Sequence, residues 1–438
     1  MIFDTIAAIA SGYINQAISI IRISGENAIK IMEQIFDGKV GNNRQITYGW
    51  IHNKGEKIDE VLVLWFPGNQ NFVGEPTVEI NAHGGVLNTN IILELILSTG
   101  LARLANPGEF SLRSFLNGKM NLVKAQAIND LIHAQSKSQH SLALKQFQGQ
   151  TSKYIKNLIT DLEFIIGTIE VNIDYPEYDE TSKLTSQTVL DGIVKLEEKF
   201  ITLIKKAENS RLIYNGIKMA LVGNVNSGKS SLLNALINEN KAIVSDQAGT
   251  TRDIVEGSFV LENLLFKISD TAGVRQTNES IEQIGIQKSF EQIQKSDLII
   301  HVIDSQVGFG PSDQEIIDSL TNQVYIQVYN KKDLLVNCED DKIYISAKNH
   351  DIDALLKQIK NSFEFLENSD VGYNTYQFSQ INKAQSALLE AKVSLEDYGP
   401  DVAIVDLRTC WTELSSIFGR ADDEKLLDSI FSNFCLGK

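Results

Sequence analysis

Residues 223–230 read GNVNSGKS, which fits the pattern GxxxxGK(S/T). The run 217–222 (IKMALV) before them has the apolar composition of a buried strand, and 230–238 (SSLLNALIN) after them reads as a helix. Glycines in such a loop let backbone N–H groups wrap phosphates at a helix N-terminus, while Lys229 reaches the outer phosphates and the Ser230 hydroxyl binds Mg²⁺. The pattern predicts a nucleotide-binding α/β domain whose phosphate-binding residues are Asn226, Ser227, Gly228, Lys229, Ser230 and Ser231.

Two later segments carry side chains that select guanine. Residues 330–333 (NKKD) follow the strand-like run 324–329, and residues 346–348 (SAK) follow 342–345. A carboxylate at Asp333 can accept two N–H bonds from guanine N1 and N2, an edge that adenine lacks. We therefore predict GTP as the ligand, and an ATPase is the weaker interpretation. The predicted base contacts are Asn330, Lys331, Asp333, Ser346 and Ala347.

The segments predicted to meet the γ-phosphate are 245–253 (SDQAGTTRD) and 270–273 (DTAG). A threonine in the first completes a Mg²⁺ shell only when the γ-phosphate is present, and we assign this contact to Thr251, beside Ser230. In the second, the acidic residue can hold Mg²⁺ through water and the glycine N–H can meet the γ-phosphate. These segments add to the predicted nucleotide site Ser245, Asp246, Gln247, Ala248, Gly249, Thr250, Thr251, Asp270, Thr271, Ala272 and Gly273.

One residue that many GTPases use is missing. Ras-like enzymes place a glutamine just after the DxxG motif to orient the attacking water. In this chain that motif is 270–273, and the residue after it is Val274. Glu279 and Glu282 lie in the segment that follows and can orient water, although on their own they are more simply explained as solvated helix charges. The sequence therefore predicts either slow hydrolysis or another group in the glutamine's place.

Length and composition restrict the class of protein. The 438 residues suffice for two to four domains of about 100–200 residues, and the 43% hydrophobic fraction is that of a globular protein. No apolar run approaches the ~18–20 residues of a membrane span, and no signal peptide is indicated. Three scattered cysteines form no disulfide framework, so we expect a cytoplasmic protein. The net charge of −16 argues against a surface that grips phosphate backbones throughout.

The pattern of apolar and polar residues changes along the chain. Strand-like and helical runs alternate over residues 17–98, which predicts a mixed α/β domain. Apolar residues recur at helical spacing through 155–169, which predicts a long amphipathic helix. We expect a polar loop at 177–187 and a second helix at 188–208.

Strands then alternate with helices up to about residue 365, which is typical of a doubly wound α/β domain, and the remainder is helical again. The fold class that we predict is multidomain, with an N-terminal α/β domain and a helical domain interrupted by an inserted P-loop GTPase domain. The expected bounds are 1–118 for the N-terminal domain, 119–212 and 369–438 for the helical domain, and 213–368 for the G domain.

Together these motifs resemble those of the MnmE (TrmE) family of tRNA modification GTPases, over essentially the whole chain. AGTTRD and DTAG are shared with other bacterial GTPases, whereas FCLGK at 434–438 and the N-terminal motifs are more specific. The N-terminal set comprises RISG at 22–25, LWFPG at 64–68, AHGG at 82–85, NPGEF at 106–110 and AQAI at 125–128.

The resemblance implies an N-terminal domain that binds folate and forms a homodimer. It implies that the chain works with the flavoprotein MnmG, which would carry FAD, as a heterotetramer that modifies C5 of the wobble uridine in certain tRNAs. The group installed would be aminomethyl or carboxymethylaminomethyl, with its carbon from 5-formyl- or methylene-tetrahydrofolate. GTP hydrolysis would be required.

The resemblance also supplies a substitute for the missing glutamine. Family members bind a potassium ion beside the phosphates when two G domains meet, and its ligands here would be Asn226, Ser245, Gln247 and Thr250. A monovalent cation can neutralise charge that develops on the transferring phosphoryl group. The water-orienting catalytic residue would be Glu282.

The family's folate contacts fall on Arg22, Glu79, Lys119 and Lys438. A pterin ring presents a guanidine-like donor edge that a carboxylate can accept, and cations suit the ligand's carboxylates. Two further residues stay open: Cys435 is either a nucleophile or part of the folate pocket wall, and His83 either does acid–base work or makes a structural hydrogen bond. The chain departs from the family's usual residues at Val225, Ala82 and Gln247, and we expect Val225 to leave phosphate binding intact but to loosen the loop near Asn226.

Two other functions compete with tRNA modification. A regulatory or ribosome-assembly GTPase usually carries an RNA-binding module after its G domain, whereas residues 377–438 here are acidic and helical. A standalone folate enzyme would leave the complete GTP site unexplained. We therefore expect a GTPase subunit of a tRNA-modifying complex.

Overall fold

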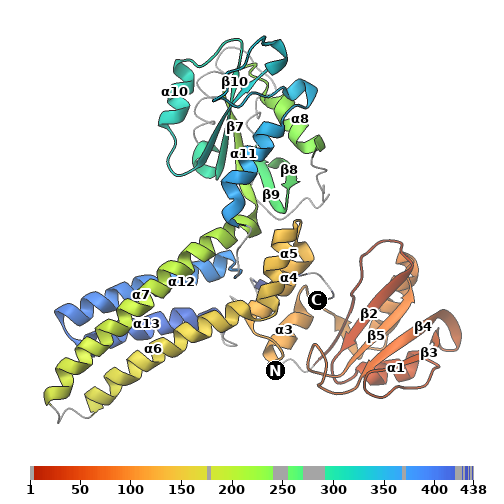
Figure 1. Cartoon of the computed structure of the whole chain (residues 1–438). Coiled ribbons are helices and arrows are strands. Elements are labelled where there is room, and N and C mark those ends of the chain that lie inside the picture. The colour runs from red at the N-terminus through yellow and green to blue at the C-terminus, as the bar shows by residue number, and fades with distance from the viewer. Residues whose placement is uncertain are drawn as a thin grey trace, which may run out of the picture. The chain divides into compact units, whose positions relative to one another are not determined.

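The computed structural model describes residues 4–174, 179–239, 255–269, 292–366 and 371–419, together with 427, 430–432, 434 and 437. They belong to two compact units, Met1–Asn129 with Ser415–Lys438, and Asp130–Leu414 (Figure 1). Within the described ranges, no helix combines the length and the apolarity that crossing a membrane requires.

The first unit is built on a six-stranded sheet with the order β3-β4-β5-β2-β1-β6, of which Figure 1 labels β2, β3, β4 and β5. Neighbouring strands run antiparallel except for β1 and β6, which are parallel. The strands are β1 (Thr5–Ile9), β2 (Ile18–Ser24), β3 (Gln45–Asn53), β4 (Glu56–Phe66), β5 (Thr77–His83) and β6 (Ala102–Leu104).

Helices α1 (Ala28–Ile35) and α2 (Val86–Ser98) cover one face of this sheet. Their buried residues pack with Ile21, Trp65 and Ile80 from the strands. Because successive strand side chains point to opposite faces, Arg22 and Glu79 project from the other face. The register places these two residues directly opposite each other on β2 and β5.

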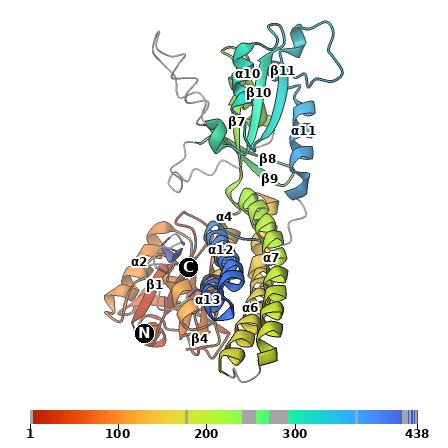
Figure 2. The same ribbon diagram turned by 90° about the vertical axis from the view of Figure 1, so that its left-hand side faces the viewer.

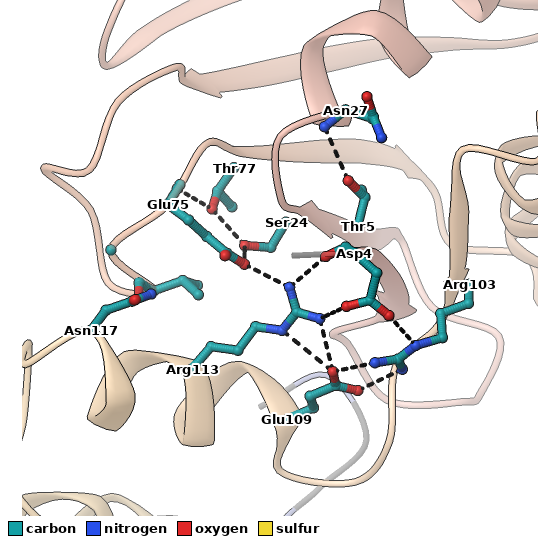
Figure 3. A network of polar contacts seen from close by, with 12 residues as sticks. Asp4, Thr5, Ser24, Asn27, Glu75, Thr77, Arg103, Glu109, Arg113 and Asn117 are labelled. Atoms are coloured by element: carbon teal, nitrogen blue, oxygen red, sulfur yellow. Dashed lines mark hydrogen bonds and ion pairs between the residues drawn. The ribbon is translucent and has the colours of Figure 1, made fainter. Parts of the chain in front are cut away.

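Helix α3 (Glu109–Leu116) is fixed in the first unit by a buried ion network (Figure 3). Arg113 is only 2% exposed, and its guanidinium lies 2.7 Å from Asp4, 3.1 Å from Glu75 and 2.9 Å from Glu109. Arg103 binds Asp4 and Glu109 from the other side. Burial alone would raise the pKa of Glu109, but hydrogen bonds from the two arginines lower it to about 2. The network thus keeps the two buried charges, Arg113 and Glu109, paired with each other and with more exposed partners.

The described residues of 427–437 dock in the same unit. Gly108 has φ of +69°, and a Cβ there would lie 2.2 Å from the carbonyl oxygen of Phe431. The rings of Phe115 and Phe431 are 6.4 Å apart. Gly437 has φ of +148°, and a Cβ there would lie 2.5 Å from the Cα of Ala10. Backbone approaches this close require glycine at both positions.

Long helices form one part of the second unit. They are α5 (Lys137–Phe147), α6 (Gln150–Asp174), α7 (Asp179–Asn215), α12 (Thr375–Asp397) and α13 (Pro400–Ser416), preceded by α4 (Leu122–His133). Helices α6, α7, α12 and α13 run side by side in both views (Figures 1 and 2). Ion pairs tie α12 to α7 and α13 to α6, through Lys392–Glu197 at 2.7 Å and Arg408–Glu170 at 2.6 Å.

The predicted loop at 177–187 is wrong over its described residues, because α7 begins at Asp179 and continues to Asn215, past the predicted end at 208. The polar composition of 179–187 suggested a loop, yet this stretch contains neither glycine nor proline to stop a helix. The predicted helix at 155–169 lies inside α6.

The other part of the second unit is a five-stranded sheet with the order β11-β10-β7-β9-β8. All neighbours are parallel except β8 and β9. Its strands are β7 (Ile217–Val222), β8 (Val255–Leu261), β9 (Leu264–Ser269), β10 (Leu298–Asp304) and β11 (Val324–Asn330). Its helices are α8 (Lys229–Glu239), α10 (Pro311–Asp318) and α11 (Asp353–Phe363), with short 3₁₀ turns at Lys332–Leu334, Ala347–Asn349 and Glu364–Leu366.

The strand predicted at 342–345 does not form. Tyr344 pairs with Tyr329 only as an isolated parallel bridge. The Ser346 N–H bonds to the Asp351 carbonyl instead of continuing the ladder, so the chain turns away after Ile345.

Glutamine side chains fasten the two connections between the helices and the inserted sheet. Gln139 Nε2 donates to the carbonyl of Tyr214 at 3.0 Å, and the Tyr214 hydroxyl donates to Gln146 at 3.0 Å. Gln146 Nε2 donates to Gln377 Oε1 at 3.1 Å. Gln146 and Gln377 are nearly fully buried, so their amides are satisfied by this chain of bonds.

Candidate nucleotide-binding site

The phosphate-binding loop leaves β7 and enters α8, as the sequence predicts. Gly223 has φ of +137°, and a Cβ there would lie 2.2 Å from the carbonyl oxygen of Val302 on β10. Gly228 has φ of +97°, and a Cβ there would lie 2.1 Å from Asn330 Nδ2. The two glycines are therefore required by the packing of the loop as well as by the approach of phosphates.

The ammonium group of Lys229 lies inside the loop. Its Nζ donates to the carbonyl oxygens of Gly223 and Asn224, both at 2.8 Å. Burial lowers the pKa of Lys229. Ser230 and Ser231 are exposed in the first turn of α8, where backbone N–H groups are available to an anion. The arrangement can hold a polyphosphate without a large rearrangement of the loop.

Asn330 joins the loop to the predicted base-binding segments. Its Nδ2 donates to the carbonyl of Ser227 at 2.8 Å, and its Oδ1 accepts from the Ala347 N–H at 3.0 Å. The Ser346 hydroxyl donates to Asp333 Oδ1 at 2.5 Å, which orients that carboxylate. The structure thus brings the phosphate-binding loop together with two segments that lie about 100 or more positions later in the sequence.

Lys331 has a partner that the motifs did not indicate. Its Nζ lies 2.5 Å from Asp304 Oδ2, at the end of β10. Burial acts to raise the pKa of Asp304, but the hydrogen bonds from Lys331 and the Gln306 N–H, together with the Lys331 charge, lower it. The only sequence signal for Asp304 is its place directly after a buried strand.

Many predicted residues lie outside the described part of the chain. They are Ser245, Asp246, Gln247, Ala248, Gly249, Thr250, Thr251, Asp270, Thr271, Ala272, Gly273, Val274, Glu279, Glu282, Cys435 and Lys438. The described half of the nucleotide site is therefore the loop, the start of α8 and the base-binding segments.

A second polar site lies on the open face of the six-stranded sheet. Arg22 Nε and Nη2 both contact Glu79 Oε1, at 2.8 and 2.7 Å, and Nη1 donates to the Gly437 carbonyl at 2.8 Å. The guanidinium also lies 5.4 Å from the centre of the Phe110 ring. The exposed Lys119 makes no hydrogen bond or ion pair with Arg22 or Glu79 within the described residues.

His83 makes a hydrogen bond of the structural kind that the sequence left open. Its Nδ1 lies 2.6 Å from Asp59 Oδ1, with side-chain exposures of 74% and 8%. Asp59 also accepts from the His83 backbone N–H at 2.9 Å and from Asn88 at 2.7 Å. The Asp59 hydrogen bond raises the pKa of His83. The imidazole is thus oriented by a buried carboxylate while most of it remains exposed.

Family comparisons agree with this arrangement. The model of the MnmE helical domain matches residues 122–435, and that of the GTP-binding protein TrmE N-terminus matches residues 5–119. The tRNA modification GTPase MnmE of Mesomycoplasma hyopneumoniae (strain 7448) is 64% identical over 100% of both chains. That of Mycoplasmopsis pulmonis is 51% identical over 100% of both, and that of Ligilactobacillus salivarius is 37% identical over 100% of this chain and 98% of its own.

These matches cover both units and the whole described nucleotide site. The fold is that of an N-terminal domain, a helical domain and a P-loop GTPase domain, and the activity is GTP hydrolysis in tRNA modification, with tRNA as the substrate. This chain belongs to the MnmE family of tRNA modification GTPases.

Proposed function

We propose that this chain is the GTP-hydrolysing subunit of a complex that modifies C5 of the wobble uridine in certain tRNAs. The group added is aminomethyl or carboxymethylaminomethyl, and its carbon comes from a tetrahydrofolate derivative. The observation that carries the proposal is the Arg22–Glu79 pair on the open sheet face, joined there by the Gly437 carbonyl.

The chemistry of that pair suits a pterin. Glu79 already binds a guanidinium, and it does so through Oε1 for both contacts. A pterin ring presents a similar donor edge, so Glu79 can accept its N–H groups when Arg22 turns toward another anion. Lys119 and Lys438 would bind the ligand's carboxylates.

The proposed nucleotide chemistry needs two cations. Mg²⁺ would be held by Ser230 and Thr251, and K⁺ by Asn226, Ser245, Gln247 and Thr250. Asn226 has φ of +63° and is exposed at the tip of the loop, which supports a ligand role for its side chain. Glu282 would orient the attacking water. The potassium ion would bind when two G domains meet, which makes hydrolysis dependent on dimerisation.

The proposed partners are a second copy of this chain and the flavoprotein MnmG, with FAD on that protein only. The proposed domain bounds are 1–118, 119–212, 213–368 and 369–438, and the family matches that change near residues 119–122 support the first of them.

A regulatory or ribosome-assembly GTPase remains the competing function. It would need the nucleotide site but not the open-face pair, because nothing in a binding switch requires Arg22 to face Glu79. The two functions are therefore separated by a ligand that only the first one binds.

The test is calorimetric titration of the full chain with 5-formyl-tetrahydrofolate. We expect binding that Glu79→Gln weakens by about tenfold or more, since hydrogen bonds to charged groups contribute about 1.5–3 kcal/mol. Glu60→Gln is the matched control, because Glu60 lies on β4 of the same sheet and should leave binding unchanged. No binding to the wild-type chain, or equal losses in both variants, would contradict the proposal.

A second measurement addresses the potassium site. Steady-state GTP hydrolysis is compared in matched KCl and NaCl. Faster hydrolysis in KCl that Asn226→Ala abolishes supports the ion, whereas equal rates in both salts would remove potassium from the proposal.

A further inference from the structure

The first half of the phosphate-binding loop is attached to a buried carboxylate that no motif marks. Asn224 Nδ2 donates to both oxygens of Asp313, at 3.2 and 3.3 Å, and the Ser312 hydroxyl donates to Asn224 Oδ1 at 2.8 Å. Asp313 lies in the first turn of α10 and is 0% exposed. An exposed loop residue is thus tied through its side chain to the interior of the domain.

His301 on β10 holds the same carboxylate from the other side. Its Nε2 lies 2.9 Å from Asp313 Oδ1, and its Nδ1 lies 2.8 Å from the Tyr325 hydroxyl on β11. A carboxylate can only accept, so the hydrogen is on Nε2, and Nδ1 accepts from the hydroxyl. Burial lowers the pKa of His301 although Asp313 acts to raise it, and burial raises the pKa of Tyr325 to about 12. The imidazole is therefore neutral and the tyrosine protonated, which is the state in which all these bonds form.

This chain of bonds reaches Lys229 through the backbone of the loop. The two carbonyls that accept from the Lys229 ammonium belong to Gly223 and Asn224. Asn224 is the residue whose side chain Asp313 holds, and Gly223 is pressed against the Val302 carbonyl of β10. Both acceptors of the ammonium are therefore fixed relative to β10 and α10.

We propose that Asp313 is a positioning residue for GTP hydrolysis. Through Asn224 it fixes the pair of carbonyls that aims Lys229 at the outer phosphates, and it does so without touching the nucleotide. His301 orients the Asp313 carboxylate by occupying one face of it. This role concerns the hydrolysis step and does not depend on the folate chemistry proposed above.

Asp313 also has a purely structural task, which the test must separate from positioning. Its Oδ2 accepts from the Gly310 N–H at 2.8 Å and so caps the start of α10. Loss of a cap lowers stability, whereas loss of positioning lowers the rate of the chemical step at unchanged ground-state affinity.

The experiment uses Asp313→Asn and Asn224→Ala in the full chain. For each variant kcat for GTP, the Kd for GDP and the melting temperature are measured. We expect kcat to fall about tenfold or more in both, because a misplacement of about 1 Å in catalytic geometry can cost on the order of 10²-fold. The Kd for GDP should change by less than about threefold, since the interaction acts mainly in the transition state.

The double variant supplies the second readout. If both residues act through one link, the combined loss in kcat should be no larger than the greater single loss. Asp297→Asn is the matched control: Asp297 Oδ2 accepts from the Lys218 N–H at 2.9 Å, at the opposite end of β7 from the loop. Its removal should lower the melting temperature and leave kcat unchanged.

Three results would overturn the proposal. They are an unchanged kcat in Asn224→Ala, additive losses in the double variant, and a parallel loss of kcat and GDP affinity that follows the melting temperature. Because Asn224 is exposed, its variant remains informative even where Asp313→Asn fails to fold.

Discussion

The nucleotide site and the open-face site of this protein are assembled in opposite ways. The candidate phosphate-binding loop takes most of its groups from eight consecutive residues, and the segments predicted to bind the base join it through the buried side chain of Asn330. The open-face site takes Arg22, Glu79 and the Gly437 carbonyl from three distant parts of the sequence. One site is a local motif at the carboxyl end of the central strand β7, while the other exists only after long-range packing.

The difference shows that a site with a clear sequence motif and a site without one depend on different interactions for their stability. The loop keeps its geometry through close backbone contacts that require glycine. The open-face site depends instead on the ion network around Arg113, whose charges neutralise one another. Ser24 of β2 shares its partner Glu75 with Arg113, so the strand that carries Arg22 is tied to the buried ion network. The predictions below probe this contrast.

The largest effect is expected from Arg113→Leu. Removal of the guanidinium breaks the buried Arg113–Glu109 pair and leaves Glu109 with Arg103, and removal of one partner of a buried ion pair costs about 3–5 kcal/mol. Denaturant unfolding should show this loss in the transition of the first unit, with nucleotide affinity preserved. A comparable loss of GTP affinity would mean that the two sites are not separable.

Asp333→Asn is expected to affect the nucleotide site. It removes the carboxylate that we predict to accept hydrogen bonds from guanine N1 and N2. The loss should weaken GTP binding by about 1.5–3 kcal/mol. The measurement is nucleotide titration with GTP and xanthosine triphosphate. If Asp333 reads the base, the preference should shift toward xanthosine triphosphate; an unchanged ratio would assign the selection to another group.

Gly437→Ala tests whether the open-face site needs its distant segment. The added Cβ would lie 2.5 Å from the Cα of Ala10 at a φ of +148°, and strain of this kind costs about 1–3 kcal/mol. We expect weaker binding of 5-formyl-tetrahydrofolate and unchanged GTP hydrolysis. Gly399→Ala is the control for positive φ, because a Cβ there meets nothing within 4 Å.

The smallest effect concerns pH. The folded-state pKa of His83 is raised by Asp59, so the ion pair stabilises fully below the unfolded pKa of about 6.5 and is lost as pH rises through the raised value. The pKa of Asp59 is lowered, so that carboxylate stays ionised throughout this range. NMR titration of His83 should give a midpoint above 6.5 that Asp59→Asn returns to it; an unchanged midpoint would contradict the pairing.

The fold around the candidate nucleotide site could be predicted from local sequence more directly than that around the open-face site, for a physical reason. Strand, loop and helix around 223–230 are contiguous, so periodicity and glycine spacing suffice to place them. The Arg22–Gly437 bond spans 415 positions, and only a resemblance to a family suggested that these parts meet. Residues such as Asp313 and His301 were missed because each is an ordinary polar residue until the fold buries it.

The two wrong elements have different causes. Polarity within 177–187 predicts a loop, but α7 continues because 179–187 contains no glycine or proline to stop a helix. Apolarity at 342–345 predicts a strand, but tertiary context prevails there, because the chain turns after Ile345 so that Ala347 bonds to Asn330.

The buried glutamine chain has a consequence for the order in which the protein folds during synthesis. Gln146 and Gln377 are separated by 231 positions, so the first must wait for its partner. At ~5–20 residues per second, that interval is on the order of 10–50 s. During this interval, helices α5 to α7 lack their packing partner α12. The five-stranded sheet, which lies between α7 and α12 in the sequence, can already fold around its own core. The nucleotide-binding part therefore has time to fold before helices α5 to α7 can pack against α12.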